Sequence, residues 1–199
     1  MKAWTQLFIV ALCFVFQTAH AKIIKQPTPL HYSPQWQTLS PEQQAVAKWI
    51  AEVKEVGLPA DTVIGIVRAA YAHANQLKVD PMRILAITRV ESRFNPNATS
   101  PHGAKGLMQV LPRWHRDKLK GRSPYNPDTS IEVGSRIYKE YLDLSKGNQS
   151  KALYRYLGGT DKNYVRLVLS AEKDLRRYVL FALFDEPPVM HKDVMLALQ

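Results

Sequence analysis

A single glutamate stands where an apolar segment of the chain gives way to a polar turn. Glu91 lies seven residues after Ile84, and the sequence Ser92-Arg93-Phe94-Asn95-Pro96 follows it. This spacing is close to two turns of an α-helix, so Glu91 is expected to project from the same stripe as the apolar side chains. Burial at the rim of an apolar surface disfavours the charged form of a carboxyl group and raises its pKa. Such a group suits general acid catalysis near neutral pH.

A glycine-rich segment, Gly103-Ala104-Lys105-Gly106-Leu107-Met108-Gln109, follows the turn. Gly103 and Gly106 permit backbone conformations closed to other residues, and they allow the main chain to approach a ligand. A plain turn would explain both glycines equally well, and a glutamate at a helix end is usually a solvated residue. The interpretation of Glu91 therefore depends on the pattern of the residues around it.

That pattern resembles the signature of the family 1 lytic transglycosylases, the soluble-type enzymes related to goose-type lysozyme. The resemblance extends from about Val63 to Val168, with further matching blocks at 126–134 and 152–158. The matching positions of the first block, in order and at the family's spacing, are Glu91, Ser92, Phe94, Asn95, Pro96, Ala98, Ser100, Gly103, Ala104, Gly106, Leu107, Met108, Gln109 and Pro112.

The resemblance implies a mostly α-helical fold, a single lysozyme-like domain of the goose type with a catalytic cleft. It also implies a glycan-cleaving lyase that needs no cofactor and acts on peptidoglycan strands at the β-1,4 bond between N-acetylmuramic acid and N-acetylglucosamine. Glu91 would protonate the glycosidic oxygen. The same residue would then act as a base toward the muramic C6 hydroxyl, which attacks C1 and closes a 1,6-anhydro ring.

Four further residues are expected to bind the substrate, again by resemblance. Ser100 resembles the serine that approaches the muramyl substituents near the acid. Met108 and Gln109 resemble residues lining the sugar cleft. Tyr156 resembles the tyrosine that hydrogen-bonds the catalytic glutamate and holds its rotamer. The next residue departs from the family's pattern, because Leu157 occupies the position of the family's usual asparagine.

Two other functions remain open at this point. A muramidase-type hydrolase would deliver water and usually needs a second carboxylate across the cleft. Asp117, Asp128 and Glu132 are the nearby candidates for that role. A non-catalytic peptidoglycan-binding module on the same fold would accommodate the change at Leu157.

Capping residues and apolar spacing predict the helices that must position these groups. The expected helices run from the Ser40-Pro41 start to about Val56, from a cap at Asp61, from Asp80-Pro81 to the stop at Asn95-Pro96, from Thr129 or Ser130 to about Ser145, from about Gln149 to Tyr156 and from about Lys162 to Phe184. Residues 96–128, rich in proline and glycine, are expected to be loop with one or two short helical turns.

The two ends of the chain predict an exported protein. Residues 1–21 have a basic start, a short apolar run and the Ala19-His20-Ala21 cleavage pattern of a signal peptide. Residues 22–39 are expected to form an extended arm, 40–184 the transglycosylase domain and 185–199 a tail. The expected location is the periplasm or cell wall, with cleavage near Ala21 and no membrane span left in the mature chain. Cys13, the only cysteine, falls in the leader, so no disulfide is expected.

Composition narrows the partners further. After loss of the leader the chain would carry 26 basic and 17 acidic residues, a net charge of +9, which suits an anionic partner such as the cell wall. The basic residues are scattered and no base-reading motif is present, so nucleic acid is not expected. His73 and His102 lack partners at metal-ligand spacing in the sequence, so no metal is expected. A secretion, conjugation or phage-like apparatus of the cell envelope is a possible partner.

Overall fold

The computed structural model describes residues 29–53, 57–159 and 161–184. The signal-peptide prediction and the tail at 185–199 lie outside these residues. Within them, no helix combines the length and the apolar character that a membrane crossing requires.

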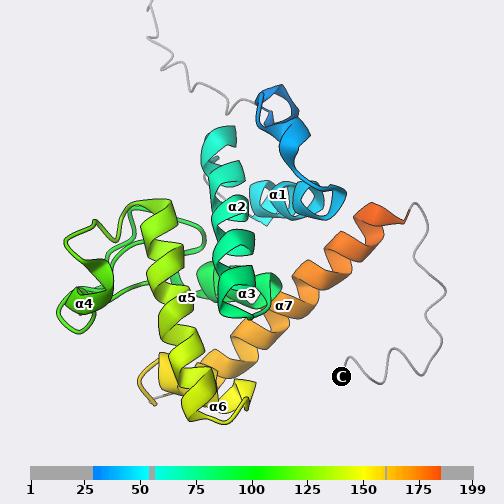
Figure 1. Ribbon diagram of the computed structural model, residues 1–199. Coiled ribbons are helices and arrows are strands. Elements are labelled where there is room, and N and C mark those ends of the chain that lie inside the picture. The colour runs from blue at the N-terminus through cyan, green and yellow to red at the C-terminus, as the bar shows by residue number, and fades with distance from the viewer. Residues whose placement is uncertain (1–28, 54–56, 160, 185–199) are drawn as a thin grey trace, which may run out of the picture.

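The described chain is mostly α-helical, as the sequence predicts. Across the described residues, two 3-10 turns (η) precede seven α-helices: η1 Leu30–Tyr32, η2 Trp36–Thr38, α1 Pro41–Val53, α2 Ala60–Leu77, α3 Pro81–Ser92, α4 Arg116–Leu119, α5 Pro127–Leu144, α6 Gln149–Tyr156 and α7 Lys162–Leu183. β-structure in the described ranges consists of two isolated bridges, which join Lys105 to Thr99 and to Val110. Figure 1 shows α2 and α5 side by side, with α7 running diagonally past α3.

Local capping explains where several helices begin. Ser40 and Gln43 form the expected capping box before α1, each side chain accepting a hydrogen bond from the other residue's backbone N–H. Asp80 caps α3 as predicted, since its carboxylate accepts from the Met82 N–H at 2.9 Å. The predicted cap at Asp61 is wrong. Asp61 lies inside the first turn of α2 and accepts a hydrogen bond from the Ser33 hydroxyl instead.

Helix α5 begins earlier than the predicted start at Thr129 or Ser130. The helix begins at Pro127, and the Asn126 side chain accepts from the Thr129 N–H at 3.0 Å. This is the same cap-then-proline arrangement that begins α3. The segment expected to be an extended arm also differs, because it contains η1 and η2, and Trp36 and Leu39 are buried in the core.

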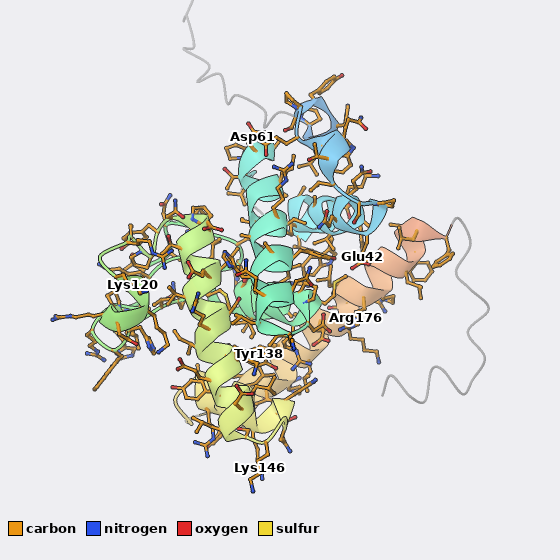
Figure 2. All side chains as sticks on the ribbon, in the orientation of Figure 1. Glu42, Asp61, Lys120, Tyr138, Lys146 and Arg176 are labelled. Atoms are coloured by element: carbon orange, nitrogen blue, oxygen red, sulfur yellow. The ribbon has the colours of Figure 1, made fainter. Side chains whose placement is uncertain are left out.

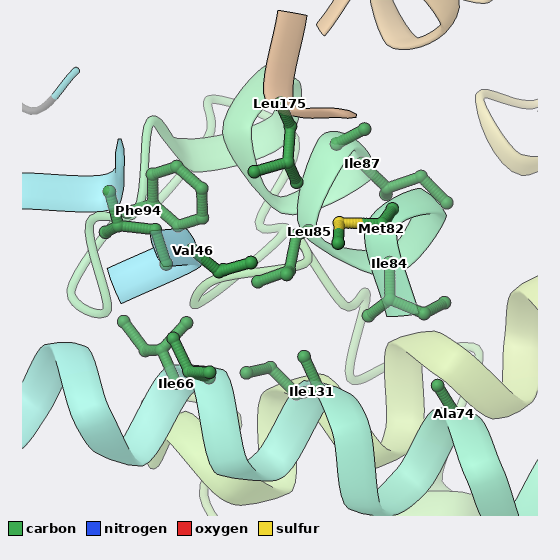
Figure 3. Packing of buried hydrophobic residues seen from close by; sticks show 14 of the residues in the cluster. Val46, Ile66, Ala74, Met82, Ile84, Leu85, Ile87, Phe94, Ile131 and Leu175 are labelled. Carbon is green, nitrogen blue, oxygen red and sulfur yellow. The ribbon is translucent and has the colours of Figure 1, made fainter. Parts of the chain in front are cut away.

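Helix α3 lies near the centre of the molecule and packs against α7, α2 and α5 (Figure 1). Seven consecutive residues of this helix, Met82 through Thr88, are buried. A helix buried on all sides belongs to a core, in contrast to the one-sided stripe of a surface helix. Figure 3 shows side chains of α3 meeting Ile66 of α2, Val46 of α1 and Leu175 of α7. Any group at the end of α3 therefore emerges from an apolar surrounding.

One charged residue lies within the buried stretch of α3. The Arg83 guanidinium forms an ion pair with Glu172 of α7 and donates to Gln149 Oε1 at 2.9 Å and to the Tyr138 hydroxyl at 3.3 Å. Arg176, one turn further along α7, binds Glu172 and also Asp80 at the start of α3. Figure 2 labels Tyr138 and Arg176 on the two helices that flank this network. The network joins α3 to α5, α6 and α7.

Candidate active site

Glu91 is the penultimate residue of α3 and is half-buried. Its Oε1 accepts a hydrogen bond of 2.6 Å from the Tyr164 hydroxyl of α7. Burial raises the pKa of the Glu91 carboxyl from its ordinary 4.5 to about 7, and the Tyr164 hydrogen bond opposes that rise. A carboxyl group with this pKa exists in both protonation states near neutral pH, so it can give up a proton and take one back.

The backbone after Glu91 turns sharply. Arg93 and Phe94 both adopt left-handed conformations, with φ of 49° and 60°. This region is unfavourable for a side chain as bulky as phenylalanine. The Phe94 ring is fully buried, so the core holds the strained turn in place. The turn ends α3 immediately after Ser92 and directs the chain into the glycine-rich loop.

The glycine-rich loop is closed by its own hydrogen bonds. The Ser100 hydroxyl oxygen accepts from the Ala104 N–H at 3.0 Å, and the Ser100 N–H donates to the Ala104 carbonyl at 2.9 Å. Lys105 and Val110 exchange two backbone hydrogen bonds of 2.9 and 3.0 Å. These contacts give the loop a fixed shape, although the sequence predicted only loop and helical turns here.

The geometry of this loop requires glycine at position 106. Its φ is +77°, and a Cβ atom there would lie 1.9 Å from the Pro124 carbonyl oxygen. The Ser130 hydroxyl of α5, also beside Gly106, accepts from the Met108 N–H at 3.1 Å. The close approach of two backbones therefore requires glycine, and it anchors the loop to the start of α5.

Met108 and Gln109 differ in what they present at the surface. Met108 is fully buried, and its side chain packs where a Cβ on Gly134 would clash, so it supports the loop from the interior. Gln109 is half-buried and donates from its amide nitrogen to the carbonyls of Ala98 and Gly106 at 3.3 and 3.0 Å. Those two bonds fix the amide and do not use its oxygen.

The tyrosine that hydrogen-bonds Glu91 is Tyr164, whereas the family resemblance pointed to Tyr156. The Tyr156 hydroxyl donates to the Met108 carbonyl at 2.9 Å and so ties α6 to the glycine-rich loop. Burial raises the pKa values of both phenols well above the ordinary range, and the nearby Glu91 charge adds to the rise. A signal for Tyr164 exists in the sequence. It shares an apolar stripe with Val168, Ala171 and Leu175, where a buried phenol needs a polar partner.

The other candidate carboxylates are engaged elsewhere in the described structure. Asp117 forms an ion pair with Lys118, and Glu132 binds the guanidinium groups of Arg122 and Arg136. The Arg122 contact lowers the pKa of the Glu132 carboxyl.

Asp128 instead lies beside a histidine that the sequence left without a partner. The His73 Nε2 lies 2.9 Å from Asp128 Oδ1, and one oxygen of Glu132 completes a group within 4.8 Å. The three side chains bring one imidazole nitrogen and two carboxylate oxygens together. Both oxygens of Glu132 already face guanidinium groups, however, which argues for an ion-pair network rather than a metal site.

Two surface hollows lie apart from Glu91. One of about 380 Å³ is lined mainly by charged residues of α4 and α5, and one of about 530 Å³ lies between α1 and α7. Glu91 lines neither of them.

Comparison with known proteins adds an independent observation. The family described as "Transglycosylase SLT domain" matches residues 68–176, which is 109 of the 199 residues. Among the curated relatives is a transglycosylase of Enterobacteria phage PRD1, 35% identical over 91 residues that make up 46% of this chain and 34% of the relative. Another is the membrane-bound lytic murein transglycosylase E of Buchnera aphidicola, 32% identical over 103 residues, 44% of this chain and 47% of the relative.

The soluble lytic murein transglycosylase of Escherichia coli is 37% identical over 73 residues, which are 32% of this chain and 11% of the relative. The matches thus span less than half the length of each of these relatives. Glu91, the rest of α3 and the hydrogen-bond partner Tyr164 fall within the range that the family description matches. The chain therefore belongs to the transglycosylase SLT domain family.

Proposed function

We propose that this protein is a lytic transglycosylase that cleaves the β-1,4 bond between N-acetylmuramic acid and N-acetylglucosamine in peptidoglycan. The observation that carries the proposal is Glu91, a half-buried carboxyl group with a pKa of about 7, held by a phenol at 2.6 Å. Family membership supports the substrate class. The predicted signal peptide supports export to the compartment where this substrate lies.

The proposed reaction uses Glu91 twice. Its protonated form donates to the glycosidic oxygen, and the bond from that oxygen to C1 of the muramyl residue breaks. The resulting carboxylate then removes the proton of the C6 hydroxyl, whose oxygen bonds to C1 and forms the 1,6-anhydro ring. Glu91 ends protonated, and water is not consumed. A pKa close to the working pH favours both halves of such a cycle, because neither proton transfer is strongly uphill.

Two residues of the loop are proposed to bind the sugar. Gln109 would accept a hydrogen bond at its amide oxygen, because its nitrogen is held by Ala98 and Gly106. The Ser100 hydroxyl would donate a hydrogen bond to the substrate, since its oxygen already accepts one from the Ala104 N–H. Met108 and Tyr156 would act from beneath, by fixing the loop that presents Gln109.

The structure favours this reaction over hydrolysis. An inverting or retaining hydrolase usually employs a second carboxylate, yet Asp117, Asp128 and Glu132 face Lys118, His73 and two arginines respectively. The alternative of a non-catalytic binding module was raised by the leucine at position 157. That residue packs at the edge of the main core, where an apolar side chain is accommodated.

The test is mass spectrometry of the muropeptides that the protein releases from purified peptidoglycan. Wild type is expected to release 1,6-anhydro-muramyl products, and Glu91→Gln is expected to lower the rate by at least about 10³-fold while still folding. Glu140→Gln, which changes an exposed glutamate of α5, serves as the matched control and should retain wild-type activity.

The other outcomes point to the alternatives. Products with free reducing ends would identify a hydrolase. Wall binding without any product from wild type would identify a binding module. Equal activity of Glu91→Gln and wild type would remove Glu91 from the mechanism.

A further inference from the structure

A tryptophan outside the family-matched range contacts the chain on both sides of Glu91. Trp49 lies in α1, before residue 68, and is 3% exposed. Its ring meets the Phe94 ring edge-on, with centroids 5.8 Å apart and an interplanar angle of 85°. The Arg89 guanidinium lies 4.9 Å from the indole centroid. Arg89 precedes Glu91 by two residues and Phe94 follows it by three.

The contact with Phe94 falls on the strained part of the site. Phe94 has φ of 60° and follows Arg93, which is also left-handed. Such conformations persist only where the surroundings hold them. Edge-to-face packing against a buried indole supplies a directional contact of this kind. On the other side of Glu91, the indole face fixes the Arg89 side chain, which also lies 3.9 Å from Asp174 of α7.

We propose that Trp49 is a positioning residue for Glu91. By holding Arg89 and Phe94, it fixes the last turn of α3 and the backbone that leaves it, and hence the direction in which the Glu91 carboxyl points. Trp49 acts through these two residues. The inference rests on the proposed function, because it assigns α1 a part in the same reaction.

A purely structural role would look different. Trp49 and Trp36 are both buried in the same core cluster, at 3% and 7% exposure. Trp36 lies in η2 and has Lys48 over its ring, so it is a matched tryptophan at a different part of the core. If Trp49 only filled space, replacing either tryptophan would lower thermal stability and leave the chemistry of the remaining folded molecules unchanged.

The experiment compares Trp49→Leu, Trp49→Phe and Trp36→Leu with wild type in two measurements. The first is kcat and KM for anhydro-product release from purified glycan strands. The second is titration of the Glu91 carboxyl by carbon-13 NMR, which needs no substrate. Tyr164 and Tyr156, which face Glu91 from α7 and α6, stay neutral over the relevant range because their own pKa values are raised.

Trp49→Leu is expected to lower kcat by about 10- to 100-fold with little change in KM, the loss typical of a misplaced catalytic group. The pKa of Glu91 should fall below its wild-type value of about 7, because a loosened turn admits water to the carboxyl. Trp49→Phe, which keeps an aromatic edge, should lower kcat by only about 3-fold. Trp36→Leu should change neither kcat nor the titration.

Unchanged kcat and an unchanged Glu91 titration in Trp49→Leu would overturn the inference. If that variant does not fold, Trp49→Phe decides by the same two measurements. Failure of the proposed function is distinguishable, because wild type would then release no anhydro products. In that case the NMR titration still tests whether Trp49 controls the environment of Glu91.

Discussion

Helices α3 and α7 enclose two glutamates in opposite ways. Glu91, near the end of α3, accepts a hydrogen bond from the neutral phenol of Tyr164, near the start of α7. Glu172, further along α7, binds the guanidinium groups of Arg83 near the start of α3 and of Arg176. The same pair of helices thus holds one carboxylate among cations and the other beside a phenol in an apolar surrounding.

The difference shows how a core separates stability from reactivity. A buried carboxylate with cationic partners has its charge compensated and serves to join elements. A partly buried carboxyl group whose described hydrogen bond comes from a neutral donor has no such compensation, so burial raises the pKa of Glu91 to about 7. Position in the core alone does not make a glutamate reactive; the partner decides.

The largest expected effect comes from removing one of the two cations that bind Glu172. Arg83→Met should reduce the free energy of unfolding by about 3–5 kcal/mol, because it leaves Glu172 buried with part of its compensation gone. Urea denaturation at pH 7 measures the effect. A second variant that also carries Glu172→Leu should recover most of the loss, since an apolar pair can replace a buried ion pair. A double variant as unstable as the single one would contradict the proposed role of Glu172.

At Glu91 the opposite change in stability is expected, because replacing this carboxyl group with a neutral amide should stabilise the protein. The folded state raises the pKa of Glu91 and so favours its protonated form. The resulting contribution to folding stability is fully present below pH 4.5 and is lost as the pH rises through about 7. Glu91→Gln should therefore be more stable than wild type at pH 8 by on the order of 2 kcal/mol, with the gain vanishing near pH 4. Glu140→Gln provides the control, and a gain that does not vary with pH would contradict the raised pKa.

The smallest effect sharpens the role of the phenol. Tyr164→Phe removes the hydrogen bond that favours the charged form of Glu91. The pKa of Glu91 should rise further, so that the alkaline limb of the kcat/KM profile moves upward by less than about one pH unit. Tyr156→Phe is the matched change, because that hydroxyl binds the Met108 carbonyl. A downward movement of the limb in Tyr164→Phe would contradict the assignment.

Sequence patterns were sufficient where a short stretch of chain determines the structure. The capping box of Ser40 and Gln43, the cap at Asp80 and the bounds of α6 from Gln149 to Tyr156 depend on neighbours along the chain. The position of Glu91 at the end of a buried helix followed from the apolar spacing around it. Its elevated pKa was expected for the reason that the structure gives, which is burial.

Contacts between distant segments were beyond those patterns. Tyr164 lies 73 residues from Glu91, and nothing in its own stretch of chain names the carboxylate it binds. Arg83 and Glu172 are 89 residues apart, so a charge inside an apolar helix gave no hint of its partner. The burial of Met108 depends on Gly134, which allows two segments to approach closely.

The turn after Glu91 has a consequence for how the sequence can vary. Position 94 requires a left-handed backbone, which glycine adopts without strain, and also an aromatic ring that meets Trp49. Phenylalanine supplies the ring and bears the backbone strain, whereas glycine would relieve the strain and lose the ring. In a saturation library selected for wall lysis, this position should therefore tolerate very few replacements, although its side chain is hidden from solvent.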